Sequence, residues 1–275
     1  LFDQVMIFGI EPFKDRKVQT GNEENESEKT KETEETEATT HNLLQLLSGF
    51  LDSEFSELRT EAAEGLVKLI FSGRLNSAKL LSRLVLLWYN PVTEEDTRLR
   101  HALGVFFPLF AYSNRTSQEC FEETFLPTLQ ILFNAPASSP LSEIDAANVA
   151  ELLVDLTRPS GLNQHFQNCQ GLTVHDNLAL KICNEILTDP SVPDVRIYAK
   201  TLRSLELSKE FTNDLMDLFE DILVKVKDKM SLKMVEKVKN NLSKGSPIDG
   251  HVSKEKDNAE NNLDCSKLCT STGQN

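Results

Sequence analysis

Residues 54–71 read EFSELRTEAAEGLVKLIF, and this stretch decides the fold. Its apolar residues recur in steps of three and four, which places them on one stripe of a 3.6-residue helix. Within the stripe, Arg59 follows an apolar residue directly, and Ala62 comes three positions later. We therefore predict a helix that buries one face, with apolar positions at Phe55, Leu58, Ala62, Leu66, Leu69 and Ile70.

The pattern returns along the chain, which makes it a repeat. Residues 194–207 carry Arg196 and Ala199 in the places of Arg59 and Ala62. Stripes of the same kind begin at Leu58, Leu99, Ile144, Val195 and Leu232, at intervals of 41, 45, 51 and 37 residues. Two-helix HEAT or armadillo units are about 40 to 47 residues long. The sequence therefore predicts an all-α chain, an α-solenoid of about five HEAT-like helical pairs.

The recurring arginine and alanine are expected to join repeats. Alanine allows two helices to approach closely, and arginine ties a helix to a neighbouring turn, so we predict structural brackets at Arg59, Ala62, Arg196 and Ala199. The alternative is that these arginines contact phosphates on a concave surface. An ordinary helical bundle would leave the recurrence unexplained.

Other helices are expected at 42–51, 77–89, 94–112, 116–134, 141–157, 174–188, 211–229 and 231–243. Gly73 is predicted to end the helix at 55–71. Capping boxes are expected at Thr93 with Asp96, Thr116 with Glu119, and Thr173 with Asp176. Two prolines fall inside helical patterns, where we expect kinks or breaks: Pro108 and Pro127.

Charge and composition divide the chain into segments. The formal net charge is −14, but residues 1–40 alone carry 11 acidic and 5 basic side chains. Residues 1–18 resemble the end of an upstream helical repeat, and residues 19–40 are polar and glutamate-rich, as expected of a disordered acidic linker. We expect the solenoid to occupy 41–245, followed by a disordered tail at 246–275. The linker is either a solvated insertion or an acidic arm that binds basic tails or competes with DNA for a basic groove.

The cellular setting can be predicted from what the sequence lacks. Its five cysteines show no tight disulfide or C-x-x-C spacing, and neither a signal peptide nor an apolar run of about 18 residues is present. These features favour a reducing, soluble, intracellular protein without membrane contact. Because the first residue is leucine, we expect the chain to be part of a longer protein.

Motifs for catalysis are missing. The sequence has no G-x-x-x-x-G-K-[ST], G-x-G-x-x-G, H-E-x-x-H or G-x-S-x-G pattern. The nearest approach to a metal site is His165, Cys169, His175 and Cys183, but Cys183 falls on an apolar stripe and the paired short spacings of zinc sites are missing. We predict no enzyme activity, no metal and no cofactor.

Two groups of residues are candidates for binding partners. Basic residues outnumber acidic ones by 11 to 8 between 196 and 244, which gives either a solvated face or a phosphate-contacting ridge. The candidate DNA-binding residues are Arg196, Lys200, Arg203, Lys225, Lys229, Lys233 and Lys237. Aromatic residues near 88–110 form either core or a groove for a partner peptide, with candidate anchors Trp88, Tyr89 and Phe106.

Three long runs carry a resemblance to a known family. They are LLWYNPVTEEDTRLRHALGVFFPLFAY (86–112), APASSPLSEIDAANVAELLVDLTRPSGL (135–162) and LTVHDNLALKICNEIL (172–187). They closely resemble the C-terminal HEAT region of the condensin I G subunits, the condensin complex subunit 3 family. The resemblance covers about residues 1–245. It implies a non-catalytic subunit that, with its kleisin partner (the condensin H subunit), binds double-stranded DNA.

The resemblance also implies indirect contact with the SMC ATPase subunits and a place in the nucleus, in the cytoplasm and on mitotic chromosomes. We therefore expect a role in DNA condensation during mitosis and cell division. The alternative is a HEAT adaptor that binds only protein partners. Ser246, before Pro247, is a minimal proline-directed site and the candidate for phosphorylation.

Overall fold

The computed structural model describes residues 42–162, 172–190, 194–208 and 212–243. The predicted segments 1–18, 19–40 and 246–275 lie outside these ranges, and so does Ser246. Residues 42–49 are helical and lead into a 3₁₀ turn, η2 (Phe50–Asp52). The elements that follow are α2 (Ser56–Phe71), α3 (Ala78–Tyr89), η3 (Pro91–Thr93), α4 (Thr97–Ala111), α5 (Arg115–Phe133), η4 (Pro140–Glu143), α6 (Ala146–Leu156), η5 (Pro159–Gly161), α7 (Val174–Thr188), α8 (Val195–Ser204), α9 (Thr212–Lys225) and α10 (Lys229–Ser243).

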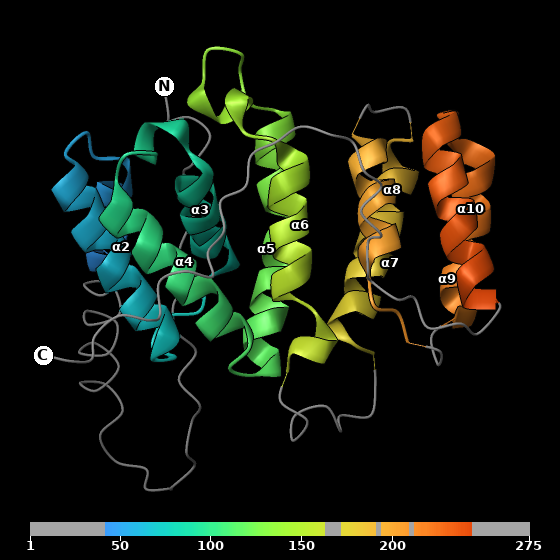
Figure 1. Cartoon of the computed structure of the whole chain (residues 1–275), viewed down its shortest axis with the longest axis horizontal. Coiled ribbons are helices and arrows are strands. Elements are labelled where there is room, and N and C mark those ends of the chain that lie inside the picture. Colours follow the sequence, from blue (N-terminus) through green and yellow to red (C-terminus); the bar gives the residue numbers. More distant parts are fainter. Residues whose placement is uncertain (1–41, 163–171, 191–193, 209–211, 244–275) are drawn as a thin grey trace, which may run out of the picture.

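The helices form two layers. One layer consists of α2, α4, α6, α8 and α10, in which each helix packs on the next, and the other consists of α3, α5, α7 and α9. Helices that follow each other along the chain, such as α5 and α6, pack across the layers. In Figure 1 the stack runs from α2 at the left to α10 at the right. This is the predicted α-solenoid, and its first layer contains all five helices that carry the sequence repeat.

Helix α2 forms where expected, but its buried stripe is shifted. The buried side chains are Arg59, Thr60, Ala62, Ala63, Leu66, Val67 and Ile70. The prediction that Phe55 and Leu58 lie on this stripe is wrong, since they are 76% and 39% exposed. Phe55 precedes the helix with an extended backbone. Leu58 is five positions before Ala63, which places it roughly 140° around the helix from that buried side chain.

The end of α2 follows the prediction. Gly73 has a φ of 69°, in the left-handed region that glycine adopts at little cost. The backbone N–H groups of Gly73 and Arg74 donate to the carbonyls of Ile70 and Leu69. Carbonyls that the helix end would leave unpaired are thereby satisfied.

Two of the three predicted capping boxes are wrong. Helix α4 is capped by Asp96, whose carboxylate accepts from the backbone N–H of Leu99, while the Thr93 hydroxyl donates to the carbonyls of Leu87 and Asn90. Helix α5 begins after Asn114, which accepts from the N–H of Ser117. Another side chain that can cap a helix lies nearby in each case, so the motif alone did not fix the start.

The third capping box, Thr173 with Asp176, is confirmed. Pro108 and Pro127 lie inside the continuous helices α4 and α5, so the expected breaks do not occur. The C-terminal helices follow the predicted ranges approximately, although α9 ends at Lys225 and α10 already starts at Lys229.

One apolar core runs through the stack. Fully buried side chains from successive helices include Leu66, Leu84, Phe107, Phe121, Leu153, Ile182, Leu202 and Phe219. Among the described helices, none combines the length and the apolar character needed to cross a lipid bilayer.

Candidate macromolecule-binding surface

The arginines of α2 and α8 occupy equivalent places in the stack. The Arg59 guanidinium donates to the carbonyl of Ser53 at 3.0 Å and lies 3.6 Å from the carboxylate of Asp96, which caps α4. Arg196 on α8 makes two hydrogen bonds, of 2.8 and 3.1 Å, to Asp228, directly before α10. Each arginine thus reaches the aspartate that precedes the next helix of the same layer, as a bracket between repeats would.

The two aspartates that the arginines contact also accept hydrogen bonds from nearby hydroxyl groups. Thr60 donates to Asp96 at 2.8 Å, and Ser231 donates to Asp228 through its hydroxyl and its backbone N–H. The hydrogen bonds from Arg196 and Ser231 hold the pKa of Asp228 well below its usual range. Ala62 and Ala199, the other predicted bracket residues, are buried beside these arginines. The sequence could have indicated Asp228 as a residue at a helix start, because aspartate is a preferred N-cap residue, but not as the partner of Arg196.

The candidate basic residues fall into three groups. On α8, Arg196, Lys200 and Arg203 project from one side, and Lys200 lies 2.6 Å from Glu151 on α6. On α10, Lys229, Lys233 and Lys237 are exposed and four residues apart, so they share one face opposite the buried Ser231, Val235 and Val238. Lys225 is exposed on α9 and belongs to neither group.

The groups also differ in whether their basic side chains form ion pairs with carboxylates. Arg196 and Lys200 each have a carboxylate partner within the fold. Within the described ranges, no ion pair involves the three lysines of the α10 face. That face therefore carries positive charge that no carboxylate of the described residues neutralises in an ion pair.

The candidate aromatic anchors mostly make contacts within the fold. Phe106 is 6% exposed and stacks on Phe110, so its prediction as an exposed anchor is wrong. Trp88 is half-buried, donates to the carbonyl of Arg100 and lies under that arginine's guanidinium. Tyr89 donates to the carbonyl of Asn148. The ring of Trp88 also packs edge-to-face on Tyr89 and on Phe107, which favours the core interpretation.

A groove of about 320 Å³ lies between α6 and α8. Small and apolar side chains from the two helices line it, among them Ala147, Ala150 and Ile197, together with the Lys200–Glu151 pair. Arg158, just after the C-terminal end of α6, lines one end of the groove. The lining carries two acidic and two basic side chains, Glu151, Asp155, Arg158 and Lys200, so it has no strong preference for one sign of ligand.

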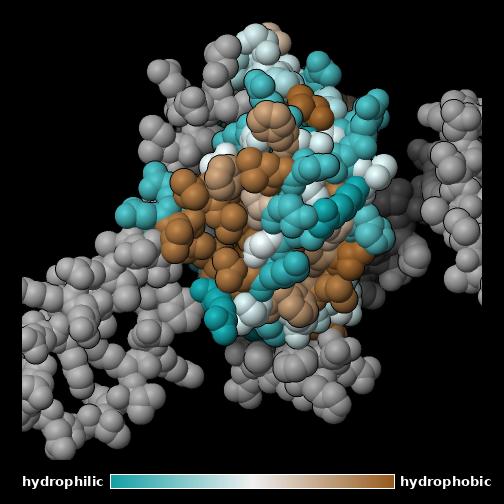
Figure 2. Space-filling view, turned by 90° about the vertical axis from the view of Figure 1, so that its left-hand side faces the viewer, coloured by the Kyte–Doolittle hydropathy of each residue, from teal (hydrophilic) through white to brown (hydrophobic). Residues whose placement is uncertain are grey.

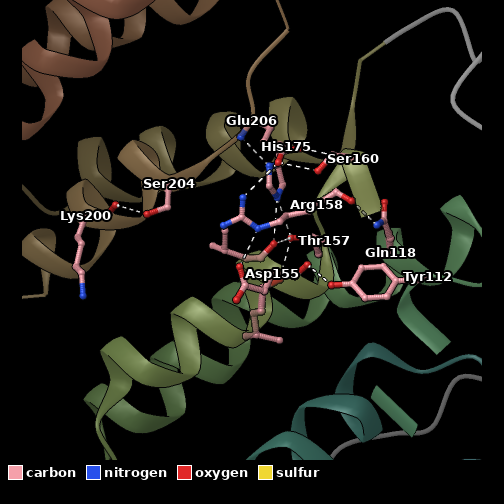
Figure 3. A network of polar contacts seen from close by, with 12 residues as sticks. Tyr112, Gln118, Asp155, Thr157, Arg158, Ser160, His175, Lys200, Ser204 and Glu206 are labelled. Carbon is pink, nitrogen blue, oxygen red and sulfur yellow. Dashed lines mark hydrogen bonds and ion pairs between the residues drawn. The ribbon is translucent and has the colours of Figure 1, made fainter. Parts of the chain in front are cut away.

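A polar network at that end joins the repeats (Figure 3). Glu206, just after α8, accepts hydrogen bonds from the hydroxyl and backbone N–H of Ser160 and from the guanidinium of Arg158. Burial alone would raise the pKa of Glu206, but these hydrogen bonds outweigh it and hold the pKa below its ordinary value. Sequence patterns gave no sign of this network, because Glu206 lies 46 positions after Ser160 and 48 positions after Arg158.

His175 on α7 is buried in the centre of the network. Burial lowers its pKa from 6.5 to about 4, so the ring is neutral at pH 7. Its Nδ1 accepts from the backbone N–H of Glu206 at 2.8 Å, which leaves Nε2 to donate to the carbonyl of Val154 at 3.2 Å. Its role is therefore a joint between α6 and the segment after α8. Of the four residues that came nearest to a metal site in the sequence, His165 and Cys169 lie outside the described residues, and the described residues show no group of ligands for a metal ion.

Gly161 marks how closely this joint is packed. A methyl group at Gly161 would lie 2.5 Å from the ring of Tyr112, which is anchored through its hydroxyl to the carbonyl of Asp155. We expect Gly161→Ala to lower the free energy of unfolding by about 1 to 3 kcal/mol, because the ring must move. Gly49→Ala is the matched control: a methyl there meets nothing within 4 Å, and the backbone is helical. Urea denaturation of both variants should show loss for the first and none for the second.

Comparison with known proteins places the chain among relatives. The sequence profile of the family described as "Nuclear condensing complex subunits, C-term domain" matches residues 1–207. Condensin complex subunit 3 of Homo sapiens is 61% identical over 283 aligned residues, which cover 100% of this chain and 27% of the relative. The Xenopus laevis protein of the same name is 57% identical, over 93% of this chain and 27% of its own length.

A solved structure shares the fold. The crystal structure of the S. pombe condensin Cnd3-Cnd2 subcomplex contains a chain that matches with a TM-score of 0.59 at 20% identity. The match covers 79% of this chain and 29% of that one. The two-layer stack of helices is thus an arrangement already known from a condensin subcomplex.

Proposed function

Because the chain belongs to the condensin complex subunit 3 family, we propose that it acts with a kleisin partner to bind double-stranded DNA and support mitotic chromosome condensation. It spans about a quarter of the length of the curated relatives that it matches, 27% in each case. The proposal for this part is a binding and scaffolding role, without catalysis. It includes indirect contact with the SMC ATPase subunits and a location in nucleus and cytoplasm and on mitotic chromosomes.

The observation that carries the DNA part is the lysine face of α10. Lys229, Lys233 and Lys237 are exposed on one side of the helix, and no ion pair of the described fold engages them. Their spacing of four residues is about 6 Å along the helix axis, so a helix laid along the DNA backbone can bring the three lysines to several phosphates.

The S. pombe relative was solved as a subcomplex with Cnd2, which supports a protein partner for this chain as well. We assign that place to the kleisin. The alternative, an adaptor that binds protein alone, has no separate observation in its favour.

Replacing Lys229, Lys233 and Lys237 together by alanine is expected to weaken duplex DNA binding roughly tenfold or more at low salt. The slope of log K against log salt concentration should fall by about 2 to 3, since each lost phosphate contact removes about 0.9. Fluorescence anisotropy of the full chain with labelled duplex, at several salt concentrations, measures both quantities.

The control variant replaces Lys68, Arg74 and Lys79, at the other end of the stack, by alanine. It changes the net charge by the same amount, so DNA affinity should stay within about twofold if binding is local. An equal loss in both variants would show that total charge, not the α10 face, controls binding. If the wild-type chain binds no duplex at low salt, the adaptor function replaces the DNA function.

A further inference from the structure

The N-terminal end of the stack is apolar. Leu43 and Leu46 on the first helix are 62% and 60% exposed, and Phe55 and Leu58 at the start of α2 are 76% and 39% exposed. We name these four residues the N-terminal end face. Figure 2 looks onto this end and shows a hydrophobic area in brown, bordered by polar residues.

This end does not have the character of a finished solenoid. Inside the stack, α4, α6 and α8 have a neighbour on each side in their layer, whereas α2 packs in its layer on α4 alone within the described chain. Terminal repeats of solenoids generally present a polar outer surface. At the other end α10 exposes Lys229, Lys233 and Lys237, and the exposed large apolar residues of α9 and α10 are Val224 and Met230. The leucines and phenylalanine of the N-terminal end face therefore require a cover.

The same chain offers a suitable occupant in residues 1–18. This segment begins LFDQVMIFGIEPF, in which Leu1, Val5 and Phe8 follow the spacing of an apolar helical stripe. Its three acidic and three basic residues cancel, so no net charge opposes docking on an apolar surface. The match to the family profile extends from residue 1 to residue 207, so the segment belongs to the same sequence unit as the helices.

The connection is long enough to allow this docking. The 22 residues 19–40 can span up to roughly 70 Å when extended, far more than the width of a helix pair. A tether of this kind also gives an effective concentration of the order of millimolar, which favours the chain's own segment over a second copy at micromolar concentration.

We propose that residues 1–18 pack on the N-terminal end face and complete the first repeat of the stack across the acidic linker. From the sequence alone, residues 1–18 are expected to pack on residues upstream of them. The exposed leucines of the N-terminal end face provide a packing surface downstream in the same chain. The linker is then a loop inserted within a repeat, and the two ends of that loop lie close together.

Amide hydrogen exchange of the full chain tests this docking. Phe8→Asp should speed exchange in residues 42–58 about tenfold or more, the order expected when the burial of one large apolar side chain is lost. Exchange in α7 to α10 should not change, which would show that the stack stays folded. Val252→Asp also replaces an apolar residue by an acidic one, in the C-terminal segment, and should leave exchange in residues 42–58 unchanged.

A photo-crosslinker placed at position 5 supplies an independent readout, since it should attach to residues 42–58. Unchanged exchange in Phe8→Asp, together with crosslinks elsewhere, would overturn the proposal. Protection of 42–58 that rises with protein concentration and ignores Phe8→Asp would also overturn it, in favour of a second copy on the same surface.

Discussion

Phe121→Ala is expected to lower the free energy of unfolding by about 3 to 5 kcal/mol, the largest effect of any single truncation considered for this chain. Phe121 on α5 has no exposed surface, and its ring lies 6.1 Å from that of Phe107 and 5.9 Å from that of Phe110. Both partners come from α4, so the cavity would open between consecutive helices of two layers. Such a site collapses poorly, because helices on both sides fix its walls.

Urea denaturation followed by circular dichroism measures this loss. Phe71→Ala serves as the matched control: Phe71 is 56% exposed at the end of α2, so its truncation should cost less than about 1 kcal/mol. Similar losses for the two variants would mean that Phe121 does not sit in a close-packed core.

The second large effect is a loss of stability in acid that depends on His175. In the folded chain burial lowers the pKa of His175 to about 4, against 6.5 for an unperturbed histidine. Below pH 6.5 His175 binds a proton in the unfolded chain but stays neutral in the folded chain until the pH approaches 4. The contribution of His175 is therefore fully present above pH 6.5 and is lost as the pH falls toward 4, by about 3 kcal/mol in total.

The charged groups around the ring are Glu206, Arg158 and Asp176. Glu206 also destabilises the fold when protonated, but its pKa is held low, so its effect comes at lower pH than most of the histidine effect. The difference in unfolding free energy between wild type and His175→Gln should thus change by about 3 kcal/mol between pH 7 and pH 4. His101→Gln replaces an exposed histidine and should retain the acid loss of the wild type. A constant difference for His175→Gln would show that the buried ring is not the source.

The repeat could be predicted from the sequence, because each helix in the layer of α2, α4, α6, α8 and α10 buries an apolar stripe. The three- and four-residue steps of that stripe are visible in the sequence. Arg59 and Arg196 stood out for the same reason. Their partners Asp96 and Asp228 did not, because they lie 37 and 32 positions away and nothing local joins them. The positions of Thr93 and Thr116 show another limit: a side chain that can cap a helix does so only if no competitor lies closer to the first turn.

The surface was harder to predict than the core. Phe106 was chosen as an anchor for its residue type, yet a partner-binding role needs exposure, which depends on how α3 and α4 pack. The His175 network was missed because it joins α4, α5, α6, α7 and the segment after α8, and only the assembled fold brings those elements together. Lys229, Lys233 and Lys237 could be found, since a spacing of four within one helix is visible in the sequence.

The packing order of the helices has a consequence for how the chain reaches its structure. Every helix packs chiefly on the next helix in sequence or on the next but one. Contacts of such short sequence separation require little loop closure, so they form early and fast. Because the ribosome synthesises a chain from its N-terminus, each helical pair can pack on the pair before it while the following pair is still being synthesised.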